Sequence, residues 1–129
     1  MSKNLITYQL NIRLIADSHI TIGRFGTYLF PAGDYVYTGS ARRNLEARIA
    51  RHHRKDKKLR WHIDYLLASP EASIIHVARF TQVECAINQL QVGSILIRGL
   101  GASDCHAGCG SHLKYLDRTG IHDQANPDC

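Results

Sequence analysis

The sequence lacks several features that would place the protein in a membrane or in a secretory pathway. It has no run of 18 apolar residues, so we expect no transmembrane helix and no membrane partner. Its N-terminus leads into a strand-like segment rather than into a signal peptide. It also has no repeat, no linker and no low-complexity tract. The 129 residues therefore predict one cytoplasmic domain over residues 1–119, followed by a flexible tail over residues 120–129.

Cysteine is scarce, and its four positions are Cys85, Cys105, Cys109 and Cys129. In a reducing compartment such residues are more often thiols or metal ligands than disulfides. Cys105 and Cys109 are four positions apart, and His112 follows three positions later. This spacing suits a structural Zn²⁺ site, with His106 or Cys85 as a fourth ligand. The alternative is a glycine-rich loop that contains buried or free thiols.

Basic residues, in contrast, are abundant and concentrated. Residues 42–60 contain nine Lys or Arg side chains against Glu46 and Asp56, a net charge of +7, whereas the whole chain carries +5. Such a basic face is typical of a nucleic-acid-binding surface, although a merely solvated helix has the same composition. The candidate nucleic-acid-binding residues are Arg42, Arg43, Arg51, Arg54, Lys57, Lys58 and Arg60.

Hydrophobic periodicity predicts an α+β fold. Strands are expected over residues 5–14, 19–22, 72–80 and 113–116, with a hairpin over 26–38 that turns at 31–33. Helices are expected over residues 44–55, 59–69 and 82–92. Asn44 would cap the first helix, and Val83, Ile87 and Leu90 would face inward from the third. The stretches GRFG and GLGAS lack the strand and helix that flank a phosphate-binding fingerprint, which argues against a nucleotide-binding fold.

One constellation of residues is suited to cleaving a phosphodiester. Arg48 and His52 are four positions apart on one helical face, and Tyr37 ends the strand that leads to that helix, with Gly39 permitting a tight change of direction. Guanidinium binds phosphate oxygens, imidazole moves protons at neutral pH, and a phenol orients or activates water. Glu84, near the start of the third helix, is the candidate ligand for a divalent cation.

The string YVYTGSA followed by LEARIARH resembles the second half of the signature of the GIY-YIG nucleases. Tyr37, Thr38 and Gly39 stand where that family has Tyr-Ile-Gly, and Arg48 and His52 stand at the positions of its helical arginine and histidine. Further blocks from about residue 5 to residue 116 resemble the Uri-type branch of this superfamily. They are FPAGDYVYTGSA, RIARHHR, WHIDYL, ECA and GLGASDCHAGCGSHL.

The resemblance implies a small antiparallel sheet of three to five strands flanked by helices, and a metal-dependent hydrolysis of DNA. It implies that Tyr8, Tyr37, Arg48 and His52 are catalytic and that Glu84 holds Mg²⁺ or Mn²⁺. Ile6 replaces the first glycine of the signature, and Tyr28, in GTY, is a rival to Tyr8, in ITY, as its first tyrosine. We favour Tyr8 because this branch places its first motif at the start of the chain.

Two other functions are compatible with the sequence. The first is a nucleic-acid-binding module that keeps the fold and lacks catalysis. The second is a zinc-stabilised interaction domain built on Cys105, Cys109 and His112.

Overall fold

A computed structural model describes residues 5–41, 43–91, 93–95 and 112–117 of the chain. Its strands are β1 (Thr7–Leu14), β2 (Ser18–Ile22), β3 (Gly26–Phe30), β4 (Gly33–Ser40), β5 (Ala72–Phe80) and β6 (Leu113–Asp117). Its helices are α1 (Leu45–His53), α2 (His62–Leu67) and α3 (Glu84–Leu90), and a 3₁₀ turn spans Gly23–Phe25. Among these described helices, none has the length and apolar character that a membrane span requires.

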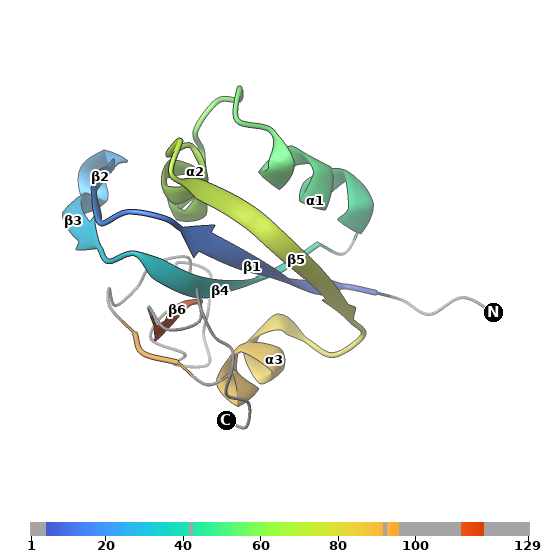
Figure 1. The fold of residues 1–129 in the computed structure, drawn as a ribbon. Helices are drawn as coiled ribbons and strands as arrows, with labels where there is room; N and C mark the ends of the chain where they lie inside the picture. The colour runs from blue at the N-terminus through green and yellow to red at the C-terminus, as the bar shows by residue number, and fades with distance from the viewer. Residues whose placement is uncertain (1–4, 42, 92, 96–111, 118–129) are drawn as a thin grey trace.

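Four of the strands form one antiparallel sheet in the order β5-β1-β4-β6, and β2 pairs with β3 in a separate two-stranded sheet. Helices α1 and α2 lie on one side of the larger sheet, and α3 lies on the other side (Figure 1). The predicted α+β class, with an antiparallel sheet flanked by helices, is therefore confirmed.

The central strand β1 follows the alternation seen in the sequence. Tyr8, Leu10, Ile12 and Leu14 share one face, and each is at most 1% exposed. Across the β1–β4 ladder, Leu10 lies opposite Tyr37, so the apolar side of β4 joins the same face. This face packs against buried residues of α1 and α2, which forms the main hydrophobic core.

The predicted hairpin over residues 26–38 is wrong. Strand β3 pairs with β2, so that Tyr28 lies opposite Ile20, while β4 pairs with β1 and β6. The reversal takes place around Gly23 and Gly26, whose φ angles of +47° and +124° favour glycine. The segment 31–33 does not reverse the chain but carries it from one sheet to the other, and Asp17 Oδ1 accepts a hydrogen bond of 2.7 Å from the Ala32 backbone N–H there.

Lysine side chains donate hydrogen bonds to backbone carbonyl oxygens at the C-terminal ends of α1 and α2. The first helix ends at His53, two residues earlier than predicted, and Lys57 Nζ donates to the carbonyl oxygen of His52 at 3.2 Å. Lys55 Nζ donates to the carbonyls of Leu67 and Ala72, both at 2.7 Å, at the end of α2. Asn44 adopts a left-handed conformation at the start of α1, and its side chain makes no capping hydrogen bond there.

The inward face predicted for the third helix is only partly correct. Ile87 is buried, but Val83 and Leu90 are 59% and 79% exposed. The reason is that α3 covers the polar face of the sheet, where the buried Gln9 side chain donates a hydrogen bond to Thr38 Oγ1 at 3.1 Å. A short helix on such a face buries few apolar side chains, so periodicity overestimates its apolar contact area.

Candidate functional site

Tyr8 and His52 meet between β1 and α1. The hydroxyl of Tyr8 lies 2.6 Å from Nε2 of His52, and the two residues are only 1% and 2% exposed. His52 reaches this position because it continues the buried stripe of α1 that begins with Leu45 and Ile49. Tyr28, the rival tyrosine, lies in the separate two-stranded sheet, where its hydroxyl donates to the carbonyl of Phe25 at 2.7 Å.

Tyr37 lies beside this pair on β4. Its ring centroid is 6.4 Å from that of Tyr8 and 6.0 Å from that of His52. Gly39 lies opposite Tyr8 in the ladder, and a Cβ at this position would lie 2.5 Å from the Tyr8 hydroxyl oxygen. Gly39 is therefore needed to admit the phenol. The predicted change of direction at this glycine is wrong, since β4 continues through Ser40.

Arg48 lies one helical turn before His52 and extends over the end of β4. Its Nη1 donates to the carbonyl oxygen of Ser40 at 3.0 Å, and its guanidinium carbon lies 4.7 Å from the ring centroid of Trp61. The Trp61 ring also lies 5.6 Å from that of His52. A guanidinium has five N–H donors, so donors other than the one bound to Ser40 are available for an anion such as phosphate.

Glu84 reaches the same end of β4 from the first turn of α3. Its Oε1 accepts a hydrogen bond of 2.6 Å from the Ser40 hydroxyl, and its Oε2 pairs with Nδ1 of His112. The Glu84 side chain is 25% exposed, so solvent and small ions have access to it. Ser40 thus joins the two charged groups of the site, because its carbonyl binds Arg48 and its hydroxyl binds Glu84.

The two phenols and the imidazole are uncharged at neutral pH, and burial strengthens their preference for the neutral form. It raises the pKa of Tyr8 above the ordinary value, an effect that the positive charge of Arg48 offsets only in part. It also raises the pKa of Tyr37, and interactions with Tyr8 and Glu84 add to this increase. The same burial lowers the pKa of His52 to about 4. These groups can therefore orient water and pass protons on, but they hold charge poorly.

Glu84, in contrast, is a carboxylate at neutral pH. Burial alone would raise its pKa, but hydrogen bonds from His112 and Ser40 outweigh burial and lower it. A single, partly exposed carboxylate suits Mg²⁺ or Mn²⁺, which keep several waters and take other ligands from phosphate groups. Among the described residues, no group of three or more His, Cys, Asp or Glu side chains is arranged around a metal position. Glu84 therefore fits the predicted cation as one ligand in a mainly aqueous shell.

The predicted zinc ligands fall in two parts of the chain. Cys105 and Cys109 lie outside the described residues. His112 is described and buried, and it pairs with Glu84 through Nδ1 while its Nε2 lies 3.9 Å from Sγ of Cys85. The zinc site stays a prediction, and the observed contacts place His112 beside the candidate cation ligand instead.

Asp64 fixes the position of Trp61 relative to α1. Its buried carboxylate accepts two hydrogen bonds of 3.0 Å from Arg51, and it also accepts the backbone N–H groups of Arg60 at 2.8 Å and Trp61 at 3.0 Å. Burial alone would raise the pKa of Asp64, but these hydrogen bonds lower it below its ordinary value. The Arg51 guanidinium carbon also lies 4.3 Å from the Trp61 ring centroid. This network places the indole where it contacts Arg48 and His52.

The seven predicted nucleic-acid-binding residues differ in their availability. Arg51 is bound to Asp64, and Lys57 donates to backbone carbonyls at the end of α1. Arg42 lies outside the described residues. The remaining four are exposed, and they are Arg43, Arg54, Lys58 and Arg60.

Reasoning from the sequence missed two contacts of the candidate site. The first is the connection of Arg48 and Glu84 through Ser40. The position of Ser40 directly after Gly39, at the end of a predicted strand, could have indicated it. The contact between His112 and Glu84 joins residues 28 positions apart, and no local spacing indicates it.

Comparison with known proteins gives one informative result. The chain matches the model of a family described as a domain of unknown function, DUF123, over residues 7–127. No curated protein matches significantly, and no solved structure does either. Because the match spans nearly the whole sequence, the chain belongs to the DUF123 family.

Proposed function

We propose that this protein is a metal-dependent endonuclease that hydrolyses phosphodiester bonds in DNA, of the GIY-YIG type and its Uri-like branch. The observation that carries the proposal is the convergence of groups from four elements at one end of the sheet. Tyr8 and Tyr37 come from β1 and β4, Arg48 and His52 from α1, and Glu84 from α3. Ser40 links Arg48 and Glu84, because its carbonyl oxygen accepts a hydrogen bond from Arg48 and its hydroxyl donates one to Glu84.

Arg48 would bind the scissile phosphate. Its charge does not depend on pH in the physiological range, and its planar fork matches two phosphate oxygens. Contacts with Ser40 and Trp61 hold the guanidinium before the substrate arrives, which reduces the reorganisation required when negative charge develops on phosphorus oxygens.

The two phenols would orient the attacking water. A neutral hydroxyl both donates and accepts a hydrogen bond, so it can align a water molecule and accept a proton as another proton leaves. Tyr8 is paired with His52 at 2.6 Å, and Tyr37 lies next to both, so a water near these hydroxyls would have a route for its proton.

Glu84 would hold the divalent cation. When bound, Mg²⁺ or Mn²⁺ supplies positive charge that stabilises the leaving oxygen. His112 and Ser40 keep the carboxylate ionised and hold it in place through hydrogen bonds to its two oxygens. The exposed residues Arg43 and Arg60 extend positive charge from the site and would contact the DNA backbone without reading sequence.

Cleavage of plasmid and branched DNA in Mg²⁺ or Mn²⁺ tests the proposal. The parent protein should cut, whereas Tyr37→Phe, Arg48→Ala and Glu84→Ala should each lose most of the activity while remaining folded by circular dichroism. If all three variants cut as well as the parent, the assigned site is wrong.

A second candidate is a nucleic-acid-binding module without catalysis, and one observation favours it. The Glu84 carboxylate already interacts with both Ser40 and His112, and a cation would have to compete with these partners. This alternative predicts salt-sensitive DNA binding with no turnover in any divalent metal.

A further inference from the structure

Two arginine side chains of α1 share one aromatic ring. The guanidinium carbon of Arg48 lies 4.7 Å from the ring centroid of Trp61, and that of Arg51 lies 4.3 Å from the same centroid. The face of an indole attracts a cation, but two guanidinium groups at one ring also repel each other. The two arginines therefore share the ring most stably when one of the two charges is neutralised.

Asp64 neutralises the charge of Arg51 but not that of Arg48. The fully buried Asp64 carboxylate accepts two hydrogen bonds of 3.0 Å from Arg51, and Nη2 of Arg51 also donates to the carbonyl oxygen of Lys58 at 2.8 Å. Arg48 donates to the Ser40 carbonyl and forms no ion pair with a carboxylate in the part of the chain that the structure describes. Its positive charge is therefore available to an anion.

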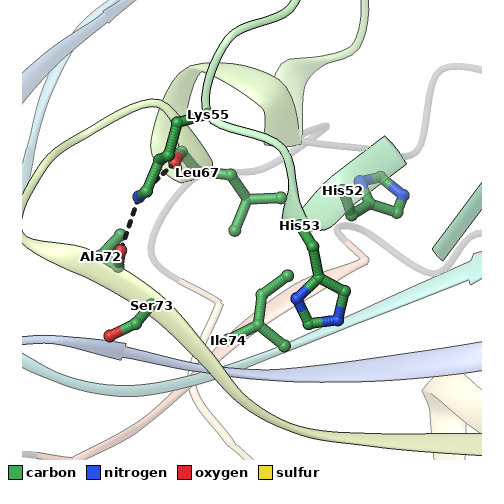
Figure 2. A pocket seen from close by; sticks show the side chains of 7 residues that line it. All are labelled: His52, His53, Lys55, Leu67, Ala72, Ser73 and Ile74. Atoms are coloured by element: carbon green, nitrogen blue, oxygen red, sulfur yellow. Dashed lines mark hydrogen bonds between the residues drawn. The ribbon is translucent and has the colours of Figure 1, made fainter. Parts of the chain in front are cut away.

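The ring itself is held in place beside α1. Asp64 also accepts the backbone N–H of Trp61 at 3.0 Å, so the same carboxylate fixes the start of α2. Lys55, which follows α1, lines the pocket shown in Figure 2 and donates to the carbonyl oxygens of Leu67 and Ala72, both at 2.7 Å. Helix α2 is thus tied to α1 at its start and to the segment after α1 at its end.

A contact with an aromatic face holds a guanidinium without using its N–H donors. A carboxylate would also hold Arg48, but it would neutralise the charge and occupy the planar fork that matches two phosphate oxygens. The face of Trp61 does neither, because the indole is uncharged and has no acceptor atom. Trp61 can therefore orient the guanidinium while its charge stays available for phosphate.

We propose that Trp61 and Asp64 together select Arg48, and not Arg51, as the arginine that binds the scissile phosphate. Asp64 holds Arg51 in an ion pair, and the Trp61 ring positions the guanidinium of Arg48. The inference rests on the proposed nuclease function and extends it by naming two positioning residues that act through Arg48. Loss of either should slow the chemical step, because the phosphate is then bound in a less favourable geometry.

Tryptophan fluorescence tests the proposal without nuclease activity. Trp61 is the only tryptophan of the sequence, so the emission reports on this ring alone. Titration with a short DNA duplex in EDTA should change the emission of the parent along the same curve as the anisotropy of a label on the DNA. In Arg48→Ala the change should be about half as large or less at equal saturation. Binding by the parent without a change in emission, or an undiminished change in Arg48→Ala, would overturn the proposal.

Two substitutions separate the aromatic face of Trp61 from its volume. In single-turnover cleavage at saturating protein, Trp61→Leu should slow the reaction by about 10-fold or more with unchanged DNA affinity. Trp61→Phe keeps an aromatic face and should stay within about 3-fold of the parent. The matched control is Phe25→Leu, which removes a half-buried ring that packs on Tyr28 and His62, and it should cut at the parental rate.

Releasing Arg51 tests the part assigned to Asp64. Asp64→Asn removes the charge that neutralises Arg51, so DNA binding should strengthen and the slope of log K against log salt concentration should steepen by about 1. The cleavage rate should nevertheless fall by about 10-fold, because a second charged guanidinium then competes for the ring and for phosphate. Asp34→Asn is the control, since Asp34 forms a similar ion pair with Arg13 toward the other end of β1, and it should cut at the parental rate. A folded Asp64→Asn with the parental rate and salt slope would overturn the selection.

The outcomes separate this inference from the function on which it rests. If the parent cuts DNA and folded Trp61→Leu cuts equally fast, the positioning role is wrong and the nuclease assignment stands. If the parent does not cut DNA in any divalent metal, both are wrong. Should Trp61→Leu or Asp64→Asn fail to fold, the fluorescence titration of the parent and Arg48→Ala decides.

Discussion

Tyr8 and Gly39 lie opposite each other across the β1–β4 ladder, and the phenol of Tyr8 occupies the space that a side chain at position 39 would need. A Cβ there would lie 2.5 Å from the Tyr8 hydroxyl oxygen and 2.6 Å from its Cζ. The requirement for glycine at position 39 of β4 therefore follows from the position of Tyr8, a candidate catalytic residue, on β1.

Gly39→Ala should therefore destabilise the protein by about 2 kcal/mol, because the added methyl group forces Tyr8 from its place beside His52. Denaturant unfolding measures this cost. In a Tyr8→Ala background the same substitution should cost much less, since the clash is gone. An equal cost in both backgrounds would show that the phenol is not what excludes a side chain at position 39.

The buried imidazole of His52 predicts an acid-sensitive fold. Its pKa is lowered by burial to about 4 from an unfolded value near 6.5, with Lys57, Arg51 and Arg48 opposing protonation and Asp64 favouring it. Below pH 6.5 the unfolded chain binds a proton that the folded chain excludes, so stability falls as the pH drops toward 4.

The loss assigned to His52 should reach up to about 3 kcal/mol across this range. It is measured as the difference between the parent and His52→Gln in the pH dependence of urea unfolding. Identical profiles for the two proteins would contradict the buried neutral state of His52.

Asp64 is predicted to be the most important charged residue for stability among those described. Its carboxylate has no exposed surface and binds Arg51 through two hydrogen bonds, so Asp64→Ala leaves a partly buried guanidinium without its partner. We expect a loss of about 3 to 5 kcal/mol in the free energy of unfolding. Glu46→Ala, which removes an exposed ion pair with Arg79, is the control and should have little effect. Similar effects of the two substitutions would contradict this ranking.

The basic residues should separate into two groups in DNA-binding measurements. Substituting alanine for exposed Lys58 or Arg60 should weaken binding to all sequences and reduce the slope of log K against log salt concentration by about 1. Arg51→Ala should mainly lower stability, because its guanidinium is committed to Asp64. Fluorescence anisotropy over a range of salt concentrations, combined with unfolding curves, distinguishes the two behaviours. A full salt-slope effect for Arg51→Ala in a stably folded variant would contradict this division.

The parts of the site that lie close together in sequence are those that could be predicted. Alternation identified β1 and its buried Tyr8, and helical spacing placed Arg48 and His52 on neighbouring turns of α1. Strand alternation and helical spacing both follow from the local backbone geometry, so they can be recognised from neighbouring residues in the sequence.

The predictions that failed, and the contacts that were missed, depend on which segments far apart in the sequence pair with each other. Strand β3 has an apolar pattern that suits pairing with β2 or with β4, and the turn at Gly23 and Gly26 decides in favour of β2. The approach of His112 to Glu84 follows from the pairing of β6 with β4, which no periodicity reveals. Ser40 gains its role only when α1 and α3 meet the end of β4.

The rate of DNA cleavage as a function of Mn²⁺ concentration tests the assigned site most directly. Parent protein and Glu84→Gln are compared on branched DNA under single-turnover conditions, with Glu46→Gln as a control that removes the same charge from an exposed position. The parent and the control should show the same saturable metal dependence, and Glu84→Gln should be slower by about 100-fold or more at every concentration. Equal rates for Glu84→Gln and the parent, or no cleavage by the parent, would contradict the account.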